Sequence, residues 1–126
     1  MTLVLDAGAL VAVERAKREV VALIKHELMA GRSPVTHAGI IGQVWRGGAG
    51  RGARVAQLLR GLDVRPLDSA LGRRAGLLLG KARLADVIDA ALALFAADGD
   101  TILTSDPGDI APLVRAAGAH VDVVSV

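Results

Sequence analysis

Three aspartates stand where a small α/β protein would bring acidic side chains together. Asp6 ends the apolar run TLVLD, Asp106 ends the later run TILTSD, and Asp89 lies on the helical segment between them. Both runs are short and rich in Val, Ile, Leu and Thr, which is typical of fully buried parallel strands. Because ligands bind outside the carboxyl ends of the strands in open α/β sheets, the two strand-end acids should meet at one edge.

Carboxylates gathered in this way point to a metal ion. Two carboxylates about 5 Å apart repel each other by roughly 3 kcal/mol at an effective dielectric constant of about 20. A divalent cation offsets this repulsion, and carboxylate oxygens are ligands that such hard cations prefer. We therefore predict that Asp6, Asp89 and Asp106 are metal ligands.

Helix capping is the competing explanation for several acids. Asp6 is well placed to cap the helix that begins near Ala9, since Asp is a favoured N-cap residue. Asp86 and Asp89 stand three residues apart at a helix start, where acids also gain about 0.3–1 kcal/mol from the helix dipole. Asp109 can be either the N-cap of the last helix or part of a site. Capping does not explain why acids occur at two strand ends and one helix start, so the combination favours a site.

Apolar runs of strand length alternate with helical periodicity along the chain. Strands are expected at the runs TLVLD, SPVTH, VRPLD, TILTSD and VDVVSV, with helical segments between them. The stretch GGAGRGAR is the best candidate for a loop. This alternation predicts a parallel sheet with helices on both faces, because crossovers between parallel strands are right-handed and need a helix.

Composition narrows the possibilities further. The 126 residues leave room for one hydrophobic core, so we expect a single domain over residues 1–126. Hydrophobic residues make up 52% of the chain and aromatic residues only 2%, so the core must be aliphatic. The absence of cysteine excludes disulfides and thiolate ligands. No signal-peptide pattern and no apolar run near the ~18 residues of a membrane span occur, so we expect a cytoplasmic location.

Four segments together resemble a known family. LDAGAL, GIIGQVWRG, DVIDAALALFAADG and TILTSDPGDI are similar, in order and spacing, to the PIN-domain ribonucleases and most closely to the VapC-type toxins of toxin–antitoxin systems. The similarity spans nearly the whole chain. It implies a three-layer α/β/α fold with a five-stranded parallel sheet and an acidic pocket that binds Mg²⁺ or Mn²⁺. It also implies an endoribonuclease that cuts single-stranded or structured RNA, forms a homodimer and is neutralised by a cognate antitoxin.

The resemblance also assigns roles to individual acids. The catalytic acids of the family correspond to Asp6, Asp89 and Asp106 in this chain. Asp86 and Asp109 are neighbours that can join the metal site. Thr104 occupies the T-x-D position of the family, and we expect its hydroxyl to support the site where substrate binds.

Gln43 departs from the family pattern, which usually has a glutamate at this point of the helix. An amide oxygen can ligate Mg²⁺ weakly or bind one of its waters, but it brings no charge and cannot accept a proton. We retain Gln43 as a candidate ligand, with lower metal affinity or a lower rate as the expected consequence.

Arginines are candidates for contacts with RNA, because a formal net charge of +2 permits nucleic-acid binding without requiring it. Arg46, Arg51 and Arg54 flank the glycine-rich stretch and could follow an RNA backbone. The same is true of Arg73, Arg74, Lys81 and Arg83. The alternative for each is a solvated helix face. With so few aromatic side chains for stacking, recognition through phosphate contacts and RNA shape is favoured.

Other classes of protein with strand-end acids fit less well. A receiver domain needs paired acids after the first strand and a late lysine, but Ala7 follows Asp6 and no lysine follows Lys81. A phosphatase with an Asp-x-Asp loop would need an acid at Gly8. The serious alternative is a catalytically weakened PIN-like module that binds RNA or protein, and Gln43 is its main support.

The apolar composition predicts an interface. The helices before Ser33 and around Trp45 should carry more apolar surface than one core can bury, which suits a homodimer or an antitoxin groove. Trp45 itself lies in the aliphatic register of its helix, so we expect it to pack into the core, with a dimer or antitoxin contact as the alternative.

Overall fold

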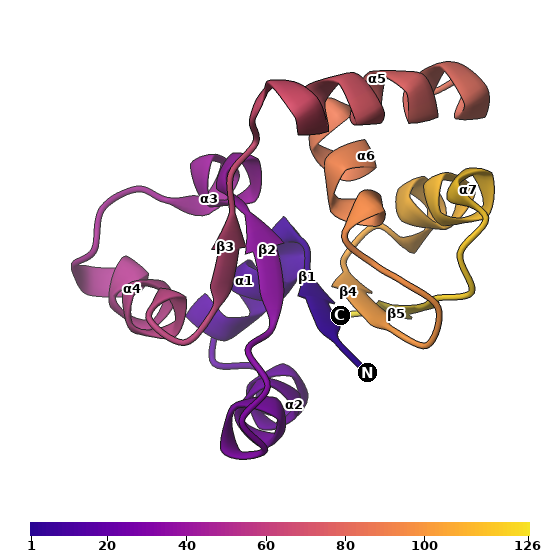
Figure 1. Cartoon of the computed structure of the whole chain (residues 1–126). Coiled ribbons are helices and arrows are strands. Elements are labelled where there is room, and N and C mark those ends of the chain that lie inside the picture. Colours follow the sequence, from indigo (N-terminus) through magenta and orange to yellow (C-terminus); the bar gives the residue numbers. More distant parts are fainter.

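The computed structural model of residues 1–126 contains one parallel sheet of five strands in the order β3-β2-β1-β4-β5 (Figure 1). The strands are β1 (Leu3–Leu5), β2 (Val35–His37), β3 (Asp63–Arg65), β4 (Thr101–Thr104) and β5 (Asp122–Ser125). The helices are α1 (Ala7–Glu14), α2 (Arg18–Met29), α3 (Ala38–Val44), the 3₁₀ turn η1 (Gly50–Gly52), α4 (Ala53–Leu59), α5 (Ser69–Ala82), α6 (Val87–Leu94) and α7 (Pro107–Ala117). The predicted alternation of strands and helices is confirmed.

Burial follows the place of each strand in the sheet. The three residues of β1, in the centre, are all buried, and so are those of β2. Residues 102–104 of β4 are buried as well. In contrast, β3 is exposed along its length, and β5 is mostly exposed, because both lie at the edges of the sheet. The continuous apolar runs of the sequence therefore mark the inner strands, where both faces are covered.

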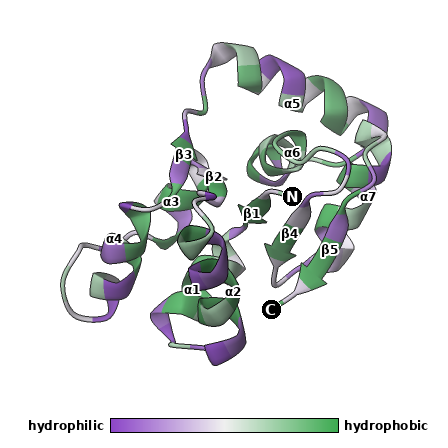
Figure 2. Ribbon diagram, turned by 60° about the horizontal axis from the view of Figure 1, so that its bottom comes forward, coloured by the Kyte–Doolittle hydropathy of each residue, from purple (hydrophilic) through white to green (hydrophobic).

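Helices cover both faces of the sheet. Helices α2, α3 and α4 all contact α1, whereas α5, α6 and α7 contact one another, and the two groups lie apart in Figure 1. The strongly apolar ribbons of β1 and α6 stand out against the mixed colouring of α4 and α5 in Figure 2. A core of 24 buried hydrophobic residues joins the layers. The expected three-layer α/β/α arrangement is confirmed. No helix has both the length and the apolar character to cross a bilayer.

The last helix begins earlier than the capping pattern suggested. We expected Asp109 as a possible N-cap, but the N-cap position belongs to Asp106, and Asp109 lies in the first turn of α7. Pro107 explains the difference, because its fixed φ suits the first helical position, where no backbone N–H is needed. The carboxylate of Asp109 remains favourable there through the helix dipole.

Trp45 is not a core residue, contrary to the expectation from its register. Helix α3 ends at Val44, and Trp45 follows it in an extended conformation with φ −71° and ψ 123°. The backbone leaves the helical path at this residue, and Trp45 remains 39% exposed.

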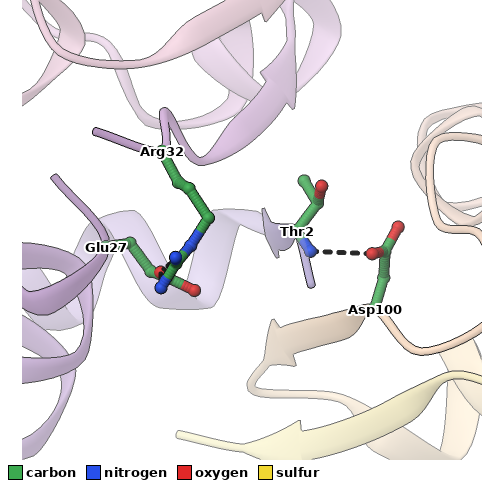
Figure 3. Close-up of polar contacts among 4 residues, drawn as sticks. All are labelled: Thr2, Glu27, Arg32 and Asp100. Carbon is green, nitrogen blue, oxygen red and sulfur yellow. Dashed lines mark hydrogen bonds and ion pairs between the residues drawn. The ribbon is translucent and has the colours of Figure 1, made fainter. Parts of the chain in front are cut away.

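Two acidic side chains accept hydrogen bonds near the amino edge of the sheet, opposite the strand ends considered above (Figure 3). The Asp100 carboxylate accepts hydrogen bonds from the backbone N–H of Thr2 at 2.7 Å and from that of Ala97 at 2.8 Å. Glu27 is buried and accepts from the Nε of Arg32 at 2.7 Å, while its Oε1 has no hydrogen-bond partner. These two acids are separate from the acids that gather at the carboxyl edge.

A glycine lets α1 approach the loop after β4. A Cβ at Gly8 would clash with the Ser105 side chain, and the Ser105 backbone nitrogen would be only 2.7 Å away. Only a residue without Cβ can therefore seat the first turn of α1 against residues 104–106. Gly76, in the middle of α5, has nothing within 4 Å of the same position.

These two glycines make a matched pair of substitutions. We expect Gly8→Ala to lower the free energy of unfolding by about 1–3 kcal/mol, because backbone must move to admit the methyl group. Gly76→Ala should instead raise it by up to about 1 kcal/mol through helix propensity. Urea unfolding followed by circular dichroism measures both. Equal effects of the two substitutions would show that the close approach at Gly8 does not matter.

Candidate metal centre

Asp6 is a buried carboxylate at the junction of β1 and α1. It follows the last residue of the central strand and is the N-cap of α1, with a relative exposure of 5%. Its Oδ1 accepts a hydrogen bond from the backbone N–H of Ala7 at 2.7 Å, and its Oδ2 accepts from the hydroxyl of Thr104 at 2.6 Å. The capping and site explanations are therefore compatible, since each carboxylate oxygen keeps a free lone pair.

Thr104 links two of the predicted acids. It ends β4, is completely buried and donates its hydroxyl hydrogen to Asp6. The same hydroxyl oxygen accepts from the backbone N–H of Asp106 at 3.0 Å. The parallel pairing of β1 with β4 brings these residues together, because Leu5 lies opposite Leu103. The Thr104 hydroxyl thus fixes the orientation of the Asp6 carboxylate. It also holds the backbone at Asp106, whose side chain is exposed.

Helix α6 presents a second pair of acids. Asp86 is its N-cap, and one carboxylate oxygen accepts from the backbone N–H of Ile88 at 2.9 Å and of Asp89 at 3.1 Å. The capping role considered for Asp86 is confirmed. Asp86, Asp89 and Asp109 line one cavity of about 180 Å³ between the start of α6 and the first turns of α7.

The charges of the other four acids at this edge act on the Asp89 carboxyl. Burial, followed by the charges of Asp86, Asp6, Asp109 and Asp106 in that order, raises the pKa of the Asp89 carboxyl to about 7. None of the three ion pairs in the structure includes any of these five acids. The carboxyl edge therefore holds a concentration of negative charge that no side chain of the protein neutralises.

This set of donors fits a hard divalent cation in its chemistry. All are carboxylate oxygens, which Mg²⁺ and Mn²⁺ prefer, and the charge that raises the pKa of Asp89 is the charge a cation would offset. No three acidic or histidine side chains already stand around one point at metal-ligand distance. The donors therefore suit an ion that keeps several waters, as Mg²⁺ usually does, better than an all-protein cage.

Gln43 lies on the other side of the first turn of α1. It is exposed and lines a cavity of about 320 Å³ with Gly8 and Ser105 among the neighbours. This cavity is separate from the one that Asp89 lines. Gln43 is therefore close to the loop that carries Asp106 but not within the main group of acids.

The three candidate arginines that flank the glycine-rich stretch lie away from the acids. Arg46 donates to the backbone carbonyl of Trp45 at 2.7 Å, and Arg54 donates to that of Glu14 at 3.0 Å, at the far end of α1 from Asp6. Arg51 belongs to the 3₁₀ turn η1 and is exposed. No hydrogen bond or ion pair joins any of them to the acids, and their role in binding RNA stays a prediction.

His37 lies beside this site, and the sequence analysis did not identify it. It ends β2 and is fully buried; its Nδ1 accepts from the backbone N–H of Gly39 at 3.0 Å. Its Nε2 therefore carries the hydrogen and donates to the carbonyl of Ile88, next to Asp89, at 2.9 Å. Desolvation lowers the pKa of His37, so the ring is neutral. The strand-end position that singled out Asp6 was the signal that could have found it.

Comparison with known proteins supports the fold. No family model matches this chain, and no curated protein matches it in sequence. Its fold is similar to that of a chain in the crystal structure of VapBC2 from Rickettsia felis bound to a DNA fragment from their promoter. The TM-score is 0.69 at 13% sequence identity, covering 98% of this chain and 99% of that chain. The five-stranded parallel α/β fold expected from the sequence is confirmed.

The raised pKa of Asp89 predicts a particular dependence of stability on pH. The folded protein binds a proton on Asp89 more tightly than the unfolded chain, whose Asp has its ordinary pKa of 3.8. Stability should therefore fall as pH rises from about 4 to about 7 and stay low above that range. One pKa unit corresponds to about 1.4 kcal/mol, and solvent screening of the partly exposed carboxyl reduces the total to about 1–2 kcal/mol.

Asp89→Asn should remove this dependence in a buffer containing EDTA. We expect the variant to gain stability over the natural protein at pH 8 but not at pH 4, as measured by urea unfolding at both values. Asp122→Asn, at the amino end of β5, removes a similar charge at the opposite edge of the sheet and serves as the control. A constant difference between Asp89→Asn and the natural protein across this range would contradict the assigned environment.

Proposed function

We propose that this protein is a metal-dependent endoribonuclease of the toxin class, neutralised by a cognate antitoxin. One observation carries the proposal: five acids without a countercharge gather at the carboxyl edge of the parallel sheet, where burial and the charges of the other four raise the pKa of Asp89 to about 7. A binding domain has no need for such a costly arrangement, whereas a hydrolase that activates water on a cation depends on it.

Asp6, Asp89 and Asp106 are the residues that would hold Mg²⁺ or Mn²⁺, with Asp86 and Asp109 beside them. The cation supplies a more acidic water as nucleophile and stabilises charge on the phosphate. Thr104 keeps Asp6 in a single orientation, and the Asp86 cap and His37 hold the first turn of α6 that presents Asp89. Asp89 gives up its proton when positive charge enters the site, so binding is coupled to pH.

A helical antitoxin segment is the partner we propose, and a second copy of the chain completes the assembly. An apolar groove of about 600 Å³ runs between α1, α2 and α4, lined by Val21, Leu28 and Leu58 among others. Arg18, Lys25 and Arg54 add positive charge to its wall. Exposed Leu23 and Met29 extend the apolar surface of α2, as the sequence led us to expect.

The alternative function is a catalytically weakened PIN-like module that binds RNA or protein. Gln43 is the specific observation in its favour, because this neutral side chain stands where the resembling family has an acid and lies outside the cavity of Asp89. The two functions differ in whether purified protein cleaves RNA when a divalent cation is added.

Cleavage of a labelled RNA, followed by gel electrophoresis with Mg²⁺, Mn²⁺ or EDTA, tests the main proposal. We expect metal-dependent cleavage by the natural protein and almost none by Asp6→Asn. Thr104→Val keeps the side-chain shape but frees Asp6, and it should lower the rate about 10- to 100-fold, as loss of a ligand-orienting group usually does. Asp122→Asn should cleave normally. Cleavage that persists in EDTA or in Asp6→Asn would contradict the proposal.

Gln43→Glu tests whether this position belongs to the metal centre. If the side chain reaches the ion or its waters, an added negative charge should tighten Mn²⁺ binding several-fold and raise the cleavage rate. Calorimetric titration with Mn²⁺ measures the first effect independently of the second. Gln57→Glu, on the wall of the α1–α2–α4 groove, makes the same change elsewhere. Identical results for both variants would place Gln43 beyond the reach of the metal.

A further inference from the structure

A small cavity with two arginines lies at the carboxyl end of β3, outside the acidic site. Its volume is about 240 Å³, and its wall includes Arg65 at the end of β3, Arg74 on α5 and Phe95 at the end of α6. Phe95 is the only phenylalanine in the chain. The acid in the wall, Asp68, already accepts a hydrogen bond from the backbone N–H of Leu71 at 2.9 Å.

The two arginines of this cavity differ in the contacts that they make. The guanidinium of Arg65 lies over the Phe95 ring, with 5.5 Å between its Cζ and the ring centroid, and its Nε pairs with Asp63 at 3.0 Å. These contacts hold a flat cation in place, and RNA bases stack on surfaces of this kind. Arg74 takes part in none of the ion pairs, so its charge is available to a phosphate.

Strand register places the cavity beside the acids. Val4 pairs with Val35, so two residues further on Asp6 stands level with His37, and His37 pairs with Arg65. Two strand spacings, or about 10 Å, therefore separate the backbone of Asp6 from that of Arg65. His37 fills the position between them, and its ring lies 5.9 Å from that of Phe95. The cavity and the acids are neighbours along one edge.

Charge and size indicate what occupies the cavity. The acids repel a polyanion, so a nuclease of this kind needs positive groups close by to hold the strand. A volume of 240 Å³ is below the range of about 300–1,000 Å³ that is usual for free small molecules. It suits a single nucleotide unit of a longer chain, with its neighbours outside.

We propose that the cavity formed by Arg65, Phe95 and Arg74 binds one nucleotide of single-stranded RNA next to the cleaved phosphate. Arg74 neutralises a phosphate, and Arg65 on Phe95 stacks against a base. The inference rests on the proposed function in one respect, namely that RNA is the substrate. It adds where the strand lies and which side chains select it.

Binding of a fluorescein-labelled single-stranded RNA in EDTA tests this without requiring cleavage. Arg74→Ala should weaken binding about 5- to 20-fold and reduce the slope of log K against log salt by roughly 0.7, the value for one phosphate contact. Arg115→Ala is the control, because Arg115 is an exposed arginine in the last turn of α7 and does not line the cavity. It should change the affinity less than twofold.

Phe95→Leu separates stacking from charge. It preserves an apolar side chain against His37, and it should weaken binding about 5- to 100-fold at every salt concentration while leaving the salt slope unchanged. Circular dichroism establishes that each variant is folded. If the Phe95 variant fails to fold, the comparison of Arg115→Ala with Arg74→Ala decides.

Several outcomes would overturn the proposal. These are no binding of RNA by the natural protein, no effect of Arg74→Ala, or equal losses in Arg115→Ala and Arg74→Ala. If Arg74→Ala instead loses binding to polyglutamate while its binding of RNA is unchanged, the cavity binds an acidic protein and not RNA. If RNA is bound through Arg74 but never cleaved with Mg²⁺ or Mn²⁺, the nuclease proposal fails and the nucleotide site remains.

Discussion

Electrostatic repulsion among five carboxylates is the constraint around which this structure is arranged. Like charges at one edge of a small sheet lower its stability unless something holds them in place. Here Asp6 and Asp86 are held by caps, which satisfy helix N–H groups and use the positive end of each helix dipole. The caps offset part of the cost for these two acids. Asp89 retains its proton up to about pH 7, because burial and the charges of the four neighbouring acids raise its pKa.

The neutral groups between the acids are as important as the acids. Thr104 and His37 are fully buried, and both use every polar atom of their side chains to join a strand end to a neighbouring element. A buried polar group that is fully bonded fixes one geometry, whereas a partly bonded one would be costly. These two residues give the acidic edge a rigid frame, which a metal site made of only a few ligands requires.

Much of this arrangement follows from the sequence, and the rest depends on tertiary structure. Continuous apolar runs predicted β1 and β4, and topology alone then placed Asp6 and Asp106 at one edge. The five apolar runs gave the number of strands, in agreement with the resemblance to PIN domains. The position of Gln43 could not be predicted, because it depends on how closely Gly8 packs against Ser105. His37 was missed because a single histidine has no motif; its role appears only when β2 is placed beside α6. Trp45 was misassigned because helical periodicity does not reveal where a helix ends.

The hydrogen bond between Thr2 and Asp100 has a consequence for the far edge of the sheet. Strand β1 is only three residues long, so its three pairs with β4 give little resistance to a slip along the strand. A slip of one residue would turn every side chain of β1 to the opposite face and carry Asp6 away from Thr104. The hydrogen bond from Thr2 to Asp100 holds the chain just before β1, and the hydrogen bond from Thr104 to Asp6 holds it just after β1. Alignment of the acids is therefore maintained from both ends of the strand, and a residue at the amino edge helps to set the geometry at the carboxyl edge.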